Sequence, residues 1–170
     1  MLTTRLDITV RTATGVGRTK LAAYDHALLN AGVGNLNLIK LSSVIPPHST
    51  VRVLEDGARE VLAGGHGDKL YCVESAVFAE HSGETVWAGL GWTRDDTTGG
   101  LFVEHHGGSE ESLLEQITLS LHDMDENRGG GYGPVESATA SAHCTDRPVC
   151  ALVVAAYAVE DWNPKEQHRG

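Results

Sequence analysis

The spacing of apolar residues along the chain predicts a series of strands and two helices. The strand segments either alternate apolar and polar residues or form short runs of Val, Leu, Ile and Ala, as is typical of strands. In the two helical segments, apolar residues recur every three or four positions. The predicted strands cover 2–11, 36–45, 69–81, 84–94, 101–106, 134–144 and 150–160, and the predicted helices cover 18–31 and 109–127.

Each predicted helix has one apolar stripe with which it can cover a sheet. Glycines mark the ends of the first helix, because Gly15 and Gly17 predict a turn before it and Gly32 and Gly34 predict its stop. The expected stripes are Leu21, Tyr24, Leu28 and Ala31 in the first helix, and Leu114, Ile117, Leu121 and Met124 in the second.

The order of these elements predicts an α+β fold, with helices that cover mostly antiparallel or mixed sheets in layers. A length of 170 residues suits a single domain over 1–170. The segment 48–68 is polar and irregular, and the polar tail from 163 to 170 is expected to fray.

Composition and charge argue against several classes of function. The net charge is −10 without a basic cluster, which argues against nucleic-acid binding. Three cysteines without a CxxC spacing argue against a disulfide framework or a structural zinc site. The chain has no signal-peptide pattern and no run of about 20 apolar residues, so we expect a soluble, cytoplasmic protein without a membrane partner.

The pair Ser42-Ser43 stands at the end of an apolar segment that Pro46-Pro47 must stop, since proline cannot donate to a strand ladder. Hydroxyls at a strand end commonly bond to nearby backbone groups. A second interpretation is that one hydroxyl attacks the peptide bond between the two serines. The pair alone leaves both interpretations open.

Asp25 and Glu104 are the acids whose positions suggest a function. The helical neighbours of Asp25 are all apolar, which makes a carboxylate costly to desolvate without a cation. Asp25 can form a salt bridge with Arg18 or Lys40, or it can bind a cationic ligand. Glu104 shares a strand face with Phe102, and a glutamate beside apolar groups can hold a proton near neutral pH. It can equally be a solvated residue on an edge strand.

Other motifs are set aside. Glu104-His105-His106 lacks the helical spacing of zinc proteases, and adjacent strand residues face opposite ways, so we expect no metal. No Gly-x-Ser-x-Gly nucleophile elbow occurs.

Together these residues resemble the pyruvoyl-dependent arginine decarboxylases. The matching block runs from Leu21 to Pro47, and it contains the family's helix, its acid at Asp25, its Asn-Leu stretch, its Ser-Ser pair and its Pro-Pro stop. A second match is the segment 100–107 around Glu104, and the apolar strand at 150–160 fits the family's C-terminal region. The resemblance implies an αββα sandwich, which agrees with the layered α+β prediction.

The resemblance also implies autocatalytic cleavage. Ser43 would attack the Ser42 carbonyl to form an ester, and β-elimination would release a β chain of residues 1–42. The α chain, 43–170, would then begin with a covalent pyruvoyl group derived from Ser43. A Ser-Ser pair at a strand end can supply the strained or polarised peptide that such chemistry needs. The pyruvoyl carbonyl would serve as the electron sink that PLP provides in other decarboxylases.

Residue roles follow from the same resemblance. Glu104 matches the proton donor to the α-carbon, and Asp25 matches the acid that pairs with the substrate guanidinium. Leu28 and Val44 match positions that line the substrate pocket. Asn37 matches a residue that contributes to processing and to substrate contact.

Asn37 adds a geometric expectation. In a straight strand it would lie ~17 Å from Ser42, too far to reach the same site. Either the strand bends or the site is shared between subunits. The family forms trimers with sites between neighbours, so we expect a homo-oligomer, a trimer or a multiple of it.

The sequence therefore predicts a lyase that decarboxylates L-arginine to agmatine and CO₂, as in polyamine biosynthesis. Two alternatives remain open: decarboxylation of another cationic amino acid such as lysine, or an unprocessed binding or structural homologue.

Overall fold

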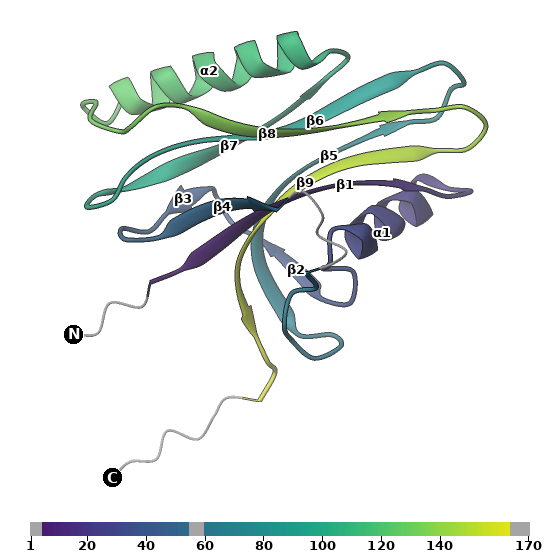
Figure 1. Ribbon diagram of the computed structural model, residues 1–170, viewed down its shortest axis with the longest axis horizontal. Coiled ribbons are helices and arrows are strands. Elements are labelled where there is room, and N and C mark those ends of the chain that lie inside the picture. Colours follow the sequence, from purple (N-terminus) through teal and green to yellow (C-terminus); the bar gives the residue numbers. More distant parts are fainter. Residues whose placement is uncertain (1–4, 55–59, 164–170) are drawn as a thin grey trace.

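Two helices cover the outer faces of two stacked sheets in the order α2, four-stranded sheet, five-stranded sheet, α1 (Figure 1). The computed structural model describes residues 5–54 and 60–163. The elements are β1 (Asp7–Val16), α1 (Lys20–Asn30), β2 (Asn37–Lys40), β3 (Val44–Ile45), β4 (Thr50–Leu54), β5 (Lys69–Ala79), β6 (Thr85–Asp95), β7 (Gly99–Gly107), α2 (Glu110–Glu126), β8 (Glu136–His143) and β9 (Val149–Glu160).

The five-stranded sheet has the order β2-β5-β9-β1-β4, and the four-stranded sheet has the order β3-β7-β6-β8. In the first sheet, β2 and β4 are parallel to their neighbours, and the other pairs are antiparallel. The second sheet is antiparallel throughout. The expected α+β sandwich of antiparallel and mixed sheets is therefore confirmed.

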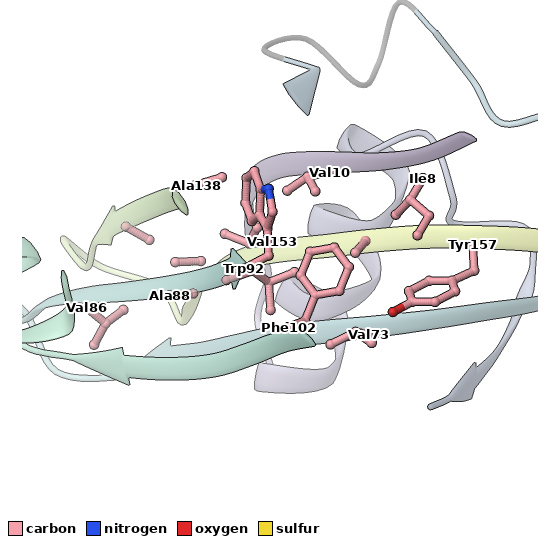
Figure 2. Packing of buried hydrophobic residues seen from close by; sticks show 14 of the residues in the cluster. Ile8, Val10, Val73, Val86, Ala88, Trp92, Phe102, Ala138, Val153 and Tyr157 are labelled. Atoms are coloured by element: carbon pink, nitrogen blue, oxygen red, sulfur yellow. The ribbon is translucent and has the colours of Figure 1, made fainter. Parts of the chain in front are cut away.

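The main core lies between the two sheets (Figure 2). Phe102 is fully buried there, and its ring centroid lies 5.7 Å from that of Trp92 and 6.0 Å from that of Tyr157. These aromatic rings pack among β-branched and small side chains from both sheets, which fixes the position of β7 against the five-stranded sheet.

Each helix packs a separate apolar face against its sheet. In α2 the buried side chains are Leu113, Ile117 and Leu121, so the predicted stripe is close to the observed one. In α1 the predicted stripe is partly wrong, because Leu21 is 76% exposed and the small residues Ala23 and Ala27 face the sheet instead.

The reason for the α1 packing lies in Gly15. A Cβ at this position would stand 2.2 Å from the carbonyl oxygen of Ala23, so the strand and the helix backbone approach as closely as only glycine allows. The predicted turn at Gly15 is wrong as well, because β1 continues to Val16 in register with β9.

Two other parts of the prediction differ from the structure. The segment 36–45 is divided into β2 and β3, which belong to different sheets. β4 lies inside the segment predicted to be irregular, and it pairs in parallel with β1. The alternation of Val51 and Val53 with polar residues is a pattern that could have predicted this strand. The predicted start of the first strand, before residue 5, and the tail beyond residue 163 lie outside the described residues.

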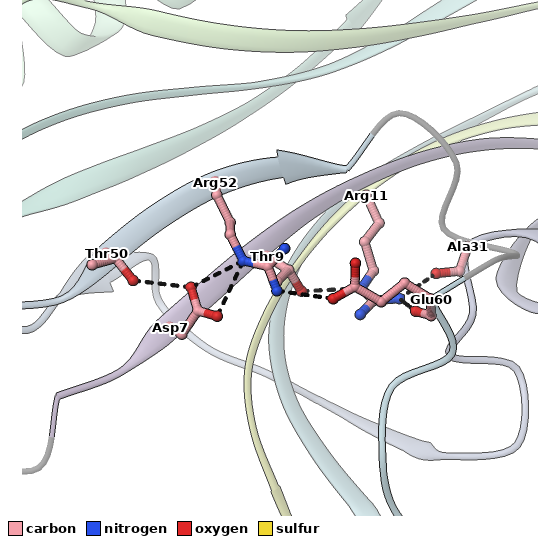
Figure 3. Close-up of polar contacts among 7 residues, drawn as sticks. All are labelled: Asp7, Thr9, Arg11, Ala31, Thr50, Arg52 and Glu60. Carbon is pink, nitrogen blue, oxygen red and sulfur yellow. Dashed lines mark hydrogen bonds and ion pairs between the residues drawn. The ribbon is translucent and has the colours of Figure 1, made fainter.

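Hydrogen bonds and ion pairs of two arginines, Arg11 on β1 and Arg52 on β4, connect the β1–β4 end of the five-stranded sheet to neighbouring segments (Figure 3). Arg11 is 1% exposed and donates to the carbonyl oxygens of Ala31, at the end of α1, and of Glu60. Arg52 pairs with the carboxylates of Asp7 and Glu60 at 3.1 and 2.9 Å. The buried guanidinium satisfies carbonyl groups that would otherwise be unpaired where the chain returns after β4.

No helix within residues 5–54 and 60–163 is long and apolar enough to cross a membrane.

Candidate functional site

Ser42 and Ser43 lie where the chain crosses from one sheet to the other. On the N-terminal side, the Leu41 amide donates to the Cys72 carbonyl of β5 at 2.9 Å, within the five-stranded sheet. On the C-terminal side, the Ser43 carbonyl accepts from the Phe102 amide of β7 at 2.8 Å, within the four-stranded sheet. The peptide bond between the serines is therefore held from both ends by different sheets.

Ser43 has a backbone conformation that is rare for its residue type. Its φ is 80°, in the left-handed region, which costs a non-glycine residue roughly 1–2 kcal/mol. Ser43 is 7% exposed, whereas Ser42 is exposed. Conformational strain of this kind persists where the surrounding structure imposes it, and it is concentrated at functional sites.

The Ser43 hydroxyl donates to a carboxylate oxygen of Glu104 on β7, with an Oγ to Oε2 distance of 3.2 Å. Both serines and Glu104 line a cavity of about 270 Å³ that extends toward α2. Glu104 is exposed in the single chain, although the cavity that it lines also contains Phe102, Val103 and Met124.

A second cavity, of about 400 Å³, shares Glu104 and His105 with the first. Its wall holds a buried carboxylate, Glu74, whose side chain is 4% exposed. The Tyr24 hydroxyl donates to Glu74, at 2.7 and 2.9 Å from its two oxygens, and the Lys40 ammonium lies 2.6 Å from Oε1.

These contacts change the ionisation of both partners of Glu74. Burial, with a contribution from Glu74, raises the pKa of Tyr24, so its hydroxyl remains a donor. The hydrogen bond from Lys40 to Glu74 raises the pKa of the Lys40 ammonium. The Lys40 ammonium therefore keeps its proton where it contacts Glu74, although the Lys40 side chain is 65% exposed.

Asp25 and Asn37, two further residues predicted for the site, lie apart from Ser43 in the single chain. Asp25 is exposed on α1, and Lys40, one of the cations considered for it, pairs with Glu74 instead. The Asn37 amide donates to the Gly67 carbonyl at 2.7 Å. Neither Asp25 nor Asn37 lines the two cavities that contain Glu104.

The two residues expected to line a substrate pocket have different surroundings. Leu28 is 8% exposed and packs in the core between α1 and the five-stranded sheet. Val44 is 57% exposed and directly follows Ser43. Their roles, like those of Asp25 and Asn37, stay predictions.

His105 and His106 differ in their surroundings. His105 Nε2 lies 2.8 Å from Ser120 Oγ of α2, whereas His106 is exposed and lines only the larger cavity. Within the described ranges, no group of three or more histidine, cysteine or acidic side chains is arranged to hold a metal ion.

Sequence reasoning missed Tyr24, Glu74 and the pairing of Lys40. One signal was available, because Glu74 is the only acid in the mostly apolar strand Lys69–Ala79. The partners of such a residue come from α1 and β2, which are distant in the sequence.

A buried serine that donates to a carboxylate beside two cavities has the features of an enzyme active site. A family model described as pyruvoyl-dependent arginine decarboxylase matches residues 7–163. The chain belongs to this family.

Curated relatives agree with this assignment. The pyruvoyl-dependent arginine decarboxylase of Thermococcus kodakarensis is 34% identical over 144 residues, which cover 84% of this chain and 88% of the relative. The protein of the same name from Halobacterium salinarum is 34% identical over 157 residues, with 91% and 95% coverage. A solved pyruvoyl-dependent histidine decarboxylase aligns over 58% of this chain and 53% of its own, with 19% identity and a TM-score of 0.43.

Proposed function

We propose that this protein cleaves itself between Ser42 and Ser43 and, in its cleaved form, decarboxylates L-arginine to agmatine and CO₂. Family membership supports the reaction and the substrate. The observation that carries the proposal within the chain is the Ser43 residue itself, which combines a left-handed φ of 80° with a hydroxyl bonded to Glu104.

Cleavage would begin when Ser43 Oγ bonds to the Ser42 carbonyl carbon and the peptide C–N bond breaks, leaving the proton on the Ser43 nitrogen. Loss of the Ser43 α-proton and of the Cβ–Oγ bond would then release Ser42 as a carboxylate. Tautomerisation and hydrolysis of the remaining dehydroalanine would release ammonia and leave a pyruvoyl group at the start of residues 43–170. Rearrangement would also relieve the left-handed strain at Ser43.

The residues at this centre fit such a group. Position 43 lines the smaller cavity, and the side chain of Glu104 reaches it. When present, the pyruvoyl carbonyl supplies an electron sink that accepts the charge left by departing CO₂. Glu104, which lies beside residue 43, would deliver the proton to the α-carbon of the substrate as a general acid.

Substrate recognition would require a neighbouring subunit. Asp25 is exposed on α1 with Leu21 and Leu29 beside it, and these two leucines are 76% and 46% exposed. Their exposure suits burial against a second copy of the chain. In this arrangement Asp25 of one subunit would pair with the guanidinium of an arginine held beside Glu104 of the next.

Strand edges on the same side support this association. β2 pairs with β5 only up to Cys72, and β3 pairs with β7 only at Gly100 and Leu101. Within the described residues, no strand pairs on this side with β5 beyond Cys72 or with β7 beyond Phe102, and natural proteins usually cover such open edges. We propose a homo-oligomer in which subunits meet here, a trimer in keeping with the resemblance, and a cytoplasmic location for the enzyme.

Intact-mass analysis tests cleavage directly. The purified protein should give fragments 1–42 and 43–170, the larger one blocked to N-terminal sequencing, in place of the 18.1 kDa chain. Release of CO₂ from labelled arginine should then exceed release from labelled lysine. A chain that stays intact on long incubation, or one that prefers lysine, contradicts the corresponding part of the proposal.

Subunit mixing tests the shared site. Asp25→Asn and Glu104→Gln proteins should each be inactive, and joint refolding should restore part of the activity, because some interfaces then contain both original acids. If each site lay within one chain, every chain in the mixture would lack one acid and no activity would return.

A further inference from the structure

Lys40 is the last residue of β2, two residues before Ser42. In the ladder between β2 and β5 it stands opposite Cys72, the final register pair of these strands. Beyond this point the chain leaves the five-stranded sheet and crosses to the other one. Lys40 is thus the last side chain of the strand ladder before the serine pair, followed only by the hydrogen bond from the Leu41 amide to the Cys72 carbonyl.

The side chain of Lys40 adds a second link between β2 and β5. It bonds at 2.6 Å to Glu74, which lies on β5 two residues past Cys72. Glu74 is itself fixed, because its side chain is 4% exposed and accepts from the Tyr24 hydroxyl of α1. The end of β2 is therefore attached to both β5 and α1 through one buried carboxylate.

The opposite side of the serine pair is also attached to a sheet. The Ser43 carbonyl accepts from Phe102, and Phe102 is fully buried in the core between the sheets. Only Leu41 and Ser42 lie between Lys40 and Ser43, and the Leu41 amide is itself bonded to the Cys72 carbonyl. With both ends held, Ser43 has little freedom to relax from its left-handed φ.

We propose that Tyr24, Glu74 and Lys40 form a clamp that positions the Ser42–Ser43 bond for self-cleavage and then retains the new C-terminal end of the shorter chain. This inference rests on the self-cleavage proposed above. These are positioning residues, because they act through the backbone of β2 and no contact joins them to the serine hydroxyls. The clamp also explains why a buried acid occurs in the apolar strand β5.

The test is the rate of cleavage of freshly refolded precursor, followed by intact mass. Lys40→Met and Glu74→Gln should each slow cleavage about tenfold or more, since small displacements of a reacting group commonly cost that much. Lys40→Arg keeps the charge and the donors, so it should cleave within about twofold of the wild-type rate. The double variant Lys40→Met/Glu74→Gln should be no slower than the slower single variant, because the two residues act as one unit.

A second ion pair on the same sheet provides the matched control. Lys69, at the other end of the β2–β5 pairing, lies 2.7 Å from Glu160. Lys69→Met removes a lysine–glutamate ion pair whose carboxylate is exposed, at the end of β2 that is distant from the serines, so it should leave the cleavage rate unchanged. Circular dichroism should show that every variant compared is folded.

The outcomes separate the two proposals. A wild-type chain that does not cleave overturns the proposed function. Normal cleavage of wild-type and of Lys40→Met overturns the clamp alone. Equal slowing by Lys69→Met, or failure of Lys40→Arg to recover the rate, would show a general stability effect and would also overturn it. If Lys40→Met does not fold because Glu74 is left unpaired, the double variant, which buries no unpaired charge, decides the question.

Discussion

Replacing Ser43 by glycine or by alanine gives two chains that cannot cleave and that differ in their tolerance of a left-handed backbone. At φ 80°, alanine keeps the conformational cost of roughly 1–2 kcal/mol, whereas glycine has almost none. Glycine in turn loses about 0.4–1 kcal/mol, because its unfolded chain is more flexible. The balance favours Ser43→Gly by roughly 0.5–1 kcal/mol.

Thermal unfolding at matched protein concentration measures this difference. In a chain of 170 residues, each kcal/mol of unfolding free energy shifts the midpoint by about 2–4 °C. The midpoint of Ser43→Gly should therefore be roughly 1–4 °C higher than that of Ser43→Ala. The sign is the diagnostic quantity, since alanine is the more stable choice wherever φ is negative. In the Ser43→Ala background, Ser42→Ala should therefore be more stable than Ser42→Gly, because Ser42 has no positive φ. A Ser43→Gly chain that melts below Ser43→Ala would refute the argument that strain is held at the cleavage site.

The remaining predictions concern Glu104, the packing of α1 and the cysteines. Glu104→Gln should still cleave, because an amide oxygen accepts the serine hydroxyl, but should lose about 100-fold or more in CO₂ release; loss of cleavage as well would show a role in processing. Gly15→Ala places a Cβ 2.2 Å from the carbonyl oxygen of Ala23, so the midpoint of thermal unfolding should fall by several degrees, at a cost of about 1–3 kcal/mol; an unchanged midpoint would contradict the close packing. Burial raises the pKa of Cys72 and of Cys150 to about 12, so a thiol reagent at pH 8 should label neither before unfolding; rapid labelling would show that these thiols are accessible.

Local periodicity was sufficient to predict the elements whose burial follows their own sequence. The apolar run in β9 is predicted correctly, and the stripe of α2 nearly so, because Ile117 and Leu121 are buried as expected while Leu113 is buried in place of Leu114. The buried face of α1 is predicted less accurately, since Leu21 fits the helical period but Ala23 and Ala27 pack on the sheet. That choice depends on Gly15, which lies on another element and permits the close approach.

The candidate site was predictable only in part, for a similar reason. Resemblance to a family identified Ser43 and Glu104, and the structure brings them to 3.2 Å. The division of 36–45 between two sheets was not predictable, because pairing with β5 and β7 is non-local. The partners of Glu74 were hidden in the same way, since they depend on which strand and helix surround it.

The position of β1 has a consequence for the protein after a cut at Ser42–Ser43. β1 lies between β9 and β4 in the five-stranded sheet, so residues 1–42 would supply an internal strand to residues 43–170. Strand pairing on both sides would keep the two pieces together as long as the sheet is folded. Refolding after denaturation would, however, become a second-order reaction that slows on dilution, whereas the uncut precursor refolds as one molecule. Maturation would thus convert a chain that can recover from unfolding by itself into one that depends on finding its other half.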